Sequence, residues 1–217
     1  MSNSSVRTRV VLVVLAALMA LPLAPTVSPV EAKQRTRTVT RTFGNATAIA
    51  LPIAPTPPVS AGLYPSTIQV SRLKGRIRDV NVRLNGLEHT YPEDIQVLLV
   101  GPDGQTAIVM ADVGKEFDVS GLTLRLDDEA EASLPFNTQL RSGVFRPTNR
   151  LGNPIAFNAP APATGANAAL SVFDGGDPNG PWRLFVQDAA AAFDDGSFAG
   201  GWELELTVRG KVKKKKR

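Results

Sequence analysis

The sequence predicts an all-β domain, an antiparallel β-sandwich or jelly roll. Several segments alternate apolar and polar residues with the period of two that places side chains on opposite faces of a strand. The 217 residues include 18 Gly and 17 Pro, spread along the chain, so turns are frequent. Beyond the N-terminal apolar stretch, we find no convincing helical periodicity. Together these observations favour short strands joined by turns.

The N-terminal segment, residues 1–32, is predicted to be a signal peptide. Arg7 and Arg9 form a positive start, an apolar stretch runs from Val10 to Leu23, and the segment ends on Val30-Glu31-Ala32. We therefore expect a secreted, extracellular protein whose mature chain begins at Lys33 and has no transmembrane segment. The alternative is an uncleaved membrane anchor, although the apolar stretch is short for one.

One domain is expected over residues 33–210, and its strands follow in order. The predicted strands are 35–43, 66–70, 76–84, 95–100, 105–110, 122–126, 169–173, 182–187 and 202–208. Asn85-Gly86 is a turn pair that should end the third of them. The segment Ile95–Val100 is apolar on both faces, as expected in the middle of a sandwich, and Gly101–Gly104 should turn it into the next strand. Residues 141–164 should form a surface excursion.

Charge is distributed unevenly along the chain. The last seven residues, 211–217, hold six basic side chains and are predicted to be a disordered basic tail. The body from Lys33 to Gly210 has 16 basic and 19 acidic residues, so the overall charge of +4 does not describe it. The tail could contact anionic polymers outside the cell through weak, salt-sensitive attraction. We expect no specific recognition of nucleic acid.

Two blocks, residues 89–104 and 180–204, carry a pattern of spaced residues. The first has His-Thr, an Asp, an apolar strand and a Pro-x-Gly turn; the second has Gly-x-Trp-x-Leu-x-Val-x-Asp, an acidic Gly loop and a final Trp-x-Leu strand. The residues that carry the pattern are His89, Thr90, Asp94, Pro102, Gly104, Gly180, Trp182, Asp188, Gly196 and Trp202.

This pattern resembles the P (Homo B) domain of subtilisin-like proprotein convertases, over about residues 76–208. The resemblance implies a jelly-roll sandwich similar to galactose-binding domains, of the kind that accompanies a serine protease domain and supports its stable folding. This chain shows no protease domain. We therefore expect a binding or stabilising module that contacts a separate protein, such as an exported protease.

His89 is the one imidazole in the chain, so it is the one candidate for the base of a Ser-His-Asp arrangement. No Gly-x-Ser-x-Gly elbow accompanies it. We therefore predict a structural role for His89, no catalytic residue and no enzymatic activity; a catalytic histidine is the alternative. A family label such as serine endopeptidase would have no residues here to support it.

Several aspartates at predicted strand ends suggest a calcium site, because Ca²⁺ binds oxygen ligands. The chain has no Cys, which excludes disulfides and thiolate-bound zinc. Asp94, Asp128 and Asp188 fall at strand ends or turns, where carboxylates could converge on a structural Ca²⁺, as P domains sometimes do. The alternative is that these residues end strands by bonding nearby backbone N–H groups.

A carbohydrate-binding module at the cell surface is the second functional hypothesis, and it rests on the analogy of fold. Trp182 and Trp202 could stack on sugars, but their places at the start of apolar strands favour core packing. Tyr91, in a loop, is the better candidate for an exposed aromatic residue.

Overall fold

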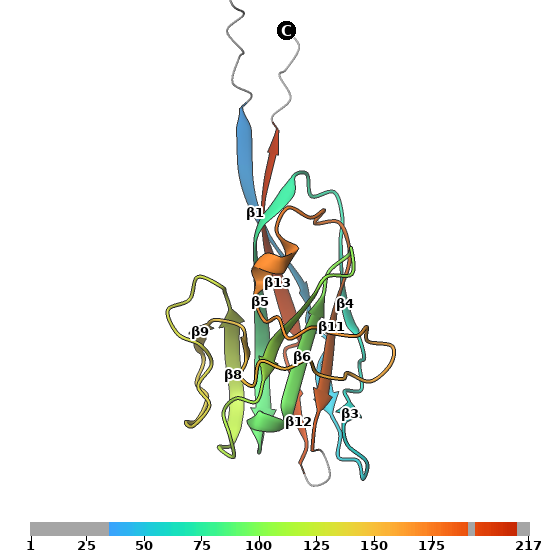
Figure 1. The fold of residues 1–217 in the computed structure, drawn as a ribbon, viewed down its shortest axis with the longest axis vertical. Helices are drawn as coiled ribbons and strands as arrows, with labels where there is room; N and C mark the ends of the chain where they lie inside the picture. The colour runs from blue at the N-terminus through green and yellow to red at the C-terminus, as the bar shows by residue number, and fades with distance from the viewer. Residues whose placement is uncertain (1–34, 191–193, 212–217) are drawn as a thin grey trace, which may run out of the picture. The chain divides into compact units, whose positions relative to one another are not determined.

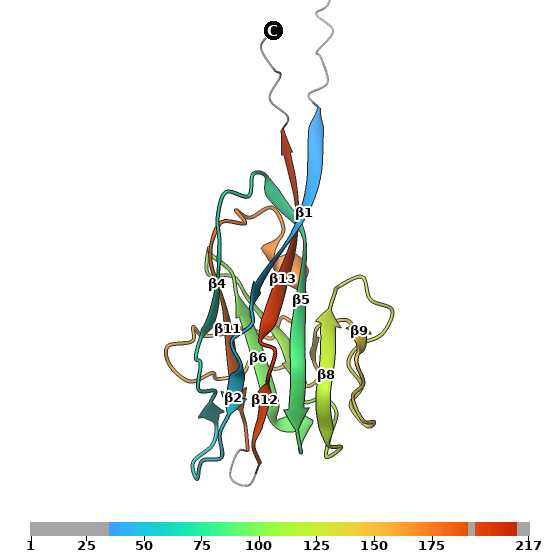
Figure 2. The same cartoon turned by 180° about the vertical axis from the view of Figure 1, so that it is seen from behind.

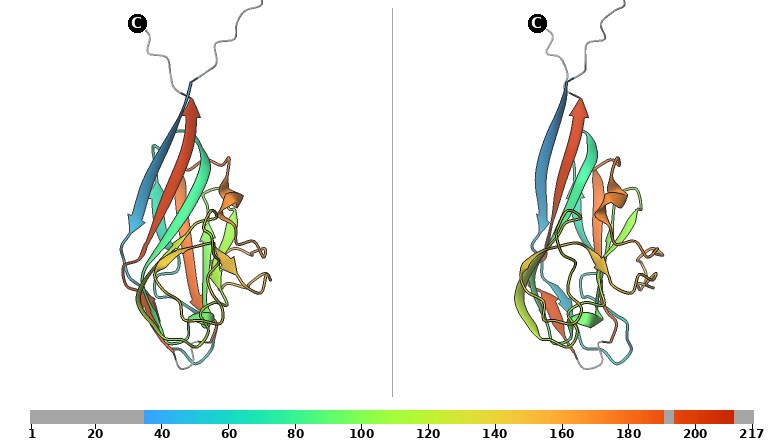
Figure 3. Two further views of the ribbon diagram at one scale, coloured as in Figure 1. Left: turned by 90° about the vertical axis from the view of Figure 1, so that its left-hand side faces the viewer. Right: turned by 60° about the vertical axis from the view of Figure 1, so that its left-hand side comes forward.

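Two β-sheets hold nearly half of the residues that the computed structural model describes, residues 35–190 and 194–211. The predicted signal peptide and the tail beyond Lys211 lie outside the described residues. The sheets lie face to face, so the all-β sandwich is confirmed (Figures 1 and 3). No helix in the described part of the chain is long and apolar enough to span a membrane.

The first sheet, sheet A, has seven strands, and its central strand is the long β5. Its order is β1-β13-β5-β12-β2, and β8 pairs with β5 and with β9 (Figure 2). The strands are β1 (Thr36–Asn45), β2 (Ile49–Leu51), β5 (Arg76–His89), β8 (Val119–Leu126), β9 (Gly143–Phe145), β12 (Gly196–Phe198) and β13 (Trp202–Lys211). The first and last strands are thus direct neighbours, in antiparallel register from Thr36 opposite Lys211 to Asn45 opposite Trp202.

The second sheet, sheet B, has six strands. Its order is β10-β7-β6-β11-β3, with β4 also pairing to β11. The strands are β3 (Val59–Ser60), β4 (Ser66–Val70), β6 (Ile95–Val100), β7 (Thr106–Ala111), β10 (Thr148–Asn149) and β11 (Gly180–Asp188). Two short 3-10 helices complete the described elements, η1 (Pro92–Asp94) and η2 (Leu170–Phe173).

The core lies between the sheets and follows from the alternation in the sequence. In β13, Trp202, Leu204, Leu206 and Val208 are all fully buried, as the pattern predicts. The same period brings the apolar residues of β5 and β11 into one cluster. Burial of this apolar area is the main stabilising contribution to the fold.

A second apolar cluster covers the outer face of sheet B. Leu98 and Val100 of β6 point to this face and pack with Ile108, Ala111 and Phe185. Ile155, Phe157 and Ala161, from the excursion at 141–164, lie over them. The excursion is thus a cover for the sheet, which explains why the segment Ile95–Val100 is apolar on both faces.

Three local predictions were wrong. Asn85-Gly86 does not end a strand: β5 runs on to His89, with a bulge at Gly86 where its partner changes from β13 to β12. The strand predicted at 169–173 is absent: Leu170–Phe173 form the 3-10 helix η2. Lys211, assigned to the tail, is the last residue of β13 and lies opposite Thr36.

Candidate functional site: a buried histidine beside an acidic cleft

The end of β5 places His89 against the end of β11. His89 Nε2 lies 2.9 Å from Asp188 Oδ2, and both side chains are almost fully buried. The other carboxylate oxygen, Oδ1, accepts the backbone N–H of Ala190 at 2.8 Å. The two blocks of the sequence pattern therefore contact each other in the interior, through one residue from each block.

Both ring nitrogens of His89 have partners, and these define its protonation. The backbone N–H of Tyr91 donates to His89 Nδ1 at 3.0 Å, so Nδ1 carries a lone pair and no proton. The proton of the neutral ring is then on Nε2, which donates to Asp188. No nitrogen is left to accept a proton from a hydroxyl, which is the task of a histidine base.

Further carboxylates gather around this pair. Asp94 ends η1, and its backbone C=O accepts the N–H of Ala189, which follows β11. Burial, and then the charge of Asp188, raise the pKa of the Asp94 carboxyl to about 6. Thr90 Oγ1 donates to Asp194 Oδ1 at 2.6 Å. Four acidic or hydroxyl side chains thus approach this end of the domain from η1, β11 and the two loops beside them.

An open cleft of about 580 Å³ lies beside His89. Three strands of sheet A reach it: the end of β5, the start of β8 and the start of β12. Its lining includes three exposed carboxylates, Glu88, Asp118 and Asp195, and no Lys or Arg. The remaining lining residues are His89, Thr90, Val119, Ser120, Gln139, Gly196 and Ser197. The cleft is acidic and polar, so it suits a cationic ligand surface better than an apolar small molecule.

Gly196 sits directly against the histidine. A Cβ atom at this position would collide with the Glu88 backbone oxygen and with Cδ2 of the His89 ring. Only glycine therefore lets β12 pair this closely with the end of β5, where Gly196 lies opposite His89. This close approach explains why the sequence pattern has a glycine at position 196.

The other residues of the pattern are structural as well. Trp182 and Trp202 are fully buried, and their Nε1–H groups donate to Pro178 O at 3.0 Å and to Ser66 Oγ at 2.9 Å. Core packing of both tryptophans is confirmed, so neither can stack on a sugar. Gly180 lies against Pro102, and Gly104 is in the turn after β6. Tyr91 is half-buried.

Asp94, Asp128 and Asp188 do not form one metal site. Asp128 lies elsewhere, and its two carboxylate oxygens accept the backbone N–H groups of Leu170 and Ser171 at 2.9 and 2.8 Å. Both oxygens of Asp188 also have partners, as described above. Within residues 35–190 and 194–211, no group of three or more His, Cys, Asp or Glu could hold a metal ion. The residues therefore do not fit the calcium hypothesis, and at Asp128 the alternative, a bond to backbone N–H groups, is observed.

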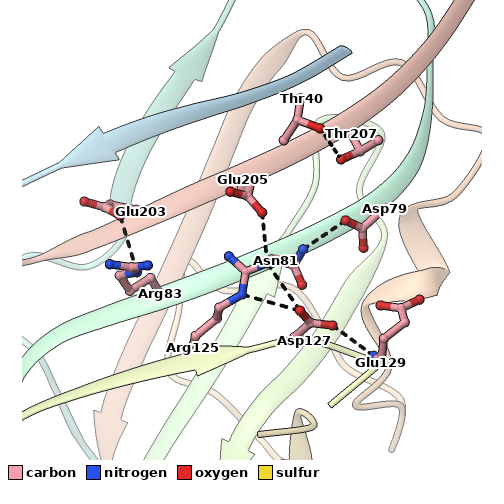
Figure 4. A network of polar contacts seen from close by, with 10 residues as sticks. All are labelled: Thr40, Asp79, Asn81, Arg83, Arg125, Asp127, Glu129, Glu203, Glu205 and Thr207. Atoms are coloured by element: carbon pink, nitrogen blue, oxygen red, sulfur yellow. Dashed lines mark hydrogen bonds and ion pairs between the residues drawn. The ribbon is translucent and has the colours of Figure 1, made fainter. Parts of the chain in front are cut away.

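A second polar network lies on the outer face of sheet A (Figure 4). Arg125 of β8 bridges Glu205 of β13 at 2.9 Å and Asp127 at 3.3 Å. Asn81 donates to Asp79 at 2.9 Å, and Arg83 lies 3.6 Å from Glu203. Arg83 and Glu203 pair across the neighbouring strands β5 and β13, and Arg125 reaches from β8 over β5 to Glu205 of β13, so the network links these three strands rather than forming a site.

The sequence analysis did not identify the cleft residues. Glu88, Asp118 and Asp195 are far apart in the sequence and follow no motif, and each resembles an ordinary solvated carboxylate. Only the pairing of β8 and β12 with the end of β5 brings them together. The excess of acidic over basic residues in the body of the chain was the one available signal.

The chain matches no protein-family model and no curated protein. Among solved structures it is similar to a serine protease of Aeromonas sobria, with 15% identity and a TM-score of 0.37. It is also similar to a structure of the Aeromonas sobria serine protease and chaperone (ORF2) complex, with 15% identity and a TM-score of 0.36. The matches cover 80% and 82% of this chain but 27% and 28% of the matched chains. A likeness of this size defines neither fold nor function.

Proposed function

We propose that this chain is an exported, non-catalytic module that binds and stabilises a protein partner, and that the partner is an exported serine protease. The observation that carries the proposal is the state of His89. The ring is buried, neutral and bonded at both nitrogens, and it forms the floor of an open acidic cleft. In this proposal His89 and Asp188 support the surface of the cleft and perform no chemistry.

The argument against catalysis is geometric. A hydroxyl nucleophile needs an imidazole nitrogen with a free lone pair within hydrogen-bond reach. The Nδ1 lone pair of His89 is used by Tyr91 N–H, and Nε2 faces Asp188. Ser120 and Ser197 line the same cleft, yet neither hydroxyl is bonded to the ring in the described residues. The serines thus belong to the binding surface.

The chemistry of the cleft indicates the kind of surface it binds. Three carboxylates, with no Lys or Arg among the described residues that line the cleft, produce a negative potential that attracts lysine and arginine side chains of a partner. Such complementarity raises the association rate and selects the partner. A protein segment is a better fit than a sugar, since both tryptophans are buried.

The choice of a protease as partner rests on the resemblance to the P domain. Residues from the two motif blocks contact each other in three places: His89 with Asp188, Pro102 with Gly180, and His89 with Gly196. A pattern whose members support one another is what a shared fold requires, which supports the resemblance.

The test uses a subtilisin-like protease exported by the same organism. The protease is refolded from denaturant with and without the purified protein, and the recovered activity is measured. We expect a several-fold gain, and we expect the triple variant Glu88→Gln, Asp118→Asn, Asp195→Asn to need about tenfold more protein for the same gain. The control removes three exposed carboxylates elsewhere, in Asp103→Asn, Glu129→Gln, Glu131→Gln, and should keep the gain.

Two results would contradict the proposal. One is recovered activity that does not depend on the protein. The other is hydrolysis of peptide or ester substrates by the protein alone that His89→Ala abolishes. A glycan array tests the carbohydrate alternative, where we expect no sugar to bind.

A further inference from the structure

β1 is an edge strand of sheet A with one side unpaired. Within the described residues it pairs only with β13. Its last residue, Asn45, is held to β4, because its side-chain N–H₂ group donates to Ser66 Oγ at 3.2 Å and Thr67 O at 3.1 Å. No described strand pairs with the other row of backbone N–H and C=O groups from Thr36 to Thr42 (Figure 2). Such an edge is a template for an added strand.

The side chains of this edge alternate between two faces. Val39 and Phe43 point toward sheet B and pack against the core. Arg37 and Arg41 share that face because they are two residues from Val39 on either side, and both are exposed. The ion pairs found in the described residues involve Arg83, His89, Lys115 and Arg125, so neither of these arginines is neutralised.

These features disfavour a second copy of β1 that pairs symmetrically about Val39. Two copies that pair antiparallel about Val39 would place Arg37 of one opposite Arg41 of the other. Like charges directly opposite each other are destabilising in a sheet. The arginines thus act against self-association at this edge, a common use of charge on edge strands. A partner of opposite charge has no such penalty.

We propose that the free edge of β1 adds an extended strand from an acidic partner protein. The strand would have the pattern acidic–x–apolar–x–acidic, opposite Arg37, Val39 and Arg41. Backbone hydrogen bonds supply affinity, and the two carboxylates and the central apolar residue supply specificity. Such a strand uses the free backbone groups, the two arginines and the apolar Val39 of the edge. An anionic polymer such as a nucleic acid would use only the charge of the arginines. The proposal is independent of the cleft.

The test measures the binding of a fluorescent peptide that contains Glu-Thr-Val-Thr-Glu to the purified protein by anisotropy. We expect Arg37→Gln with Arg41→Gln to weaken binding about tenfold, since each cross-strand charge pair contributes up to about 1 kcal/mol. The matched control, Arg76→Gln with Arg141→Gln, removes two exposed charges that lie outside β1 and its neighbour β13, and should change binding less than about twofold. Melting curves of both variants verify that they are folded.

The decisive ligand is the same peptide N-methylated at alternate residues, in two versions offset by one residue. Methylation keeps the charge and removes the N–H donors, so at least one version should fail to bind if a strand is added. Equal binding of both methylated versions would overturn the proposal. So would equal binding of an oligonucleotide of the same charge, or an equal loss in the two arginine variants.

Discussion

His89 and Asp188 form a pair whose stability depends on both members. Removal of one partner from a buried pair leaves an uncompensated polar or charged group and commonly costs about 3–5 kcal/mol. The N–H groups of Tyr91 and Ala190 complete the pair by donating to His89 Nδ1 and to Asp188 Oδ1. Each buried polar atom of the pair is therefore satisfied, which lets a polar group lie at the end of the core without an unfavourable desolvation cost.

Asp94 should make stability depend on pH. Its folded pKa of about 6 is above the roughly 3.9 of an unfolded Asp, so the folded state holds the proton more tightly. Its contribution is fully present below about pH 4 and is lost as the pH rises through about 6. We expect Asp94→Asn to stabilise the protein by about 1 kcal/mol at pH 7.5, a value reduced because the group is partly exposed, and to change nothing at pH 4.

Thermal melting of the two proteins at both pH values measures this effect. The expected rise at pH 7.5 is about 2–4 °C. A difference in Tm that is the same at pH 4 and pH 7.5 would show that Asp94 acts through packing and not through its charge.

At the residue scale, sequence reasoning identified the members of the pattern but not their chemistry. It predicted a structural His89 and buried tryptophans, and the structure confirms that Trp182 and Trp202 are buried. It grouped Asp128 with Asp94 and Asp188 because all three lie near strand ends. Strand ends occur at several places on a sandwich, however, and only the pairing of the strands determines which ends meet.

At the scale of elements, the bulge at Gly86 lets one strand serve two partners. β5 pairs with β13 up to Leu84 and with β12 from Leu87, and β8 follows its other edge. The Asn-Gly pair is a strong local signal for a turn. Here the apolar residues on both sides of the Asn-Gly pair are stabilised more by burial within the sheet than by a local turn. Long-range strand pairing therefore overrides the local signal. The regular strands were predictable because alternation and burial agree within each of them.

Gly201 lies between β12 and β13, at the point where they approach the end of β1. Its φ is +64°, and an added Cβ would collide with the backbone oxygen of Asn45. Gly121 has a similar φ of +67° but has open space around it. We expect Gly121→Ala to cost about 1 kcal/mol of unfolding free energy from backbone strain alone. We expect Gly201→Ala to cost several times more, about 3 kcal/mol or above, since β1 must also move.

Urea unfolding of both variants supplies the comparison. Similar losses of unfolding free energy in the two variants would mean that the junction of β1, β12 and β13 adapts to the extra carbon without strain.

At the scale of the whole molecule, stability should not depend on calcium. Each oxygen of Asp128 and Asp188 already has a hydrogen-bond donor, and Asp128 lies away from the other two aspartates, so the three carboxylates do not converge on one ion. We therefore expect the Tm in EDTA and in millimolar calcium to agree within about 1 °C. A rise of several degrees in calcium would require a set of ligands that includes residues other than these.

The place of β13 in sheet A bears on how the chain reaches its native state. This strand is made last, yet it lies between β1, which is made first, and β5. Until the ten residues of β13 are in place, both neighbouring strands present open edges, and the hydrophobic interior lacks Trp202 and three further apolar side chains. A growing polypeptide can therefore collapse but cannot complete its tertiary structure, and such an intermediate is prone to aggregate unless it is shielded. Folding of this domain therefore cannot finish until β13 is inserted between β1 and β5.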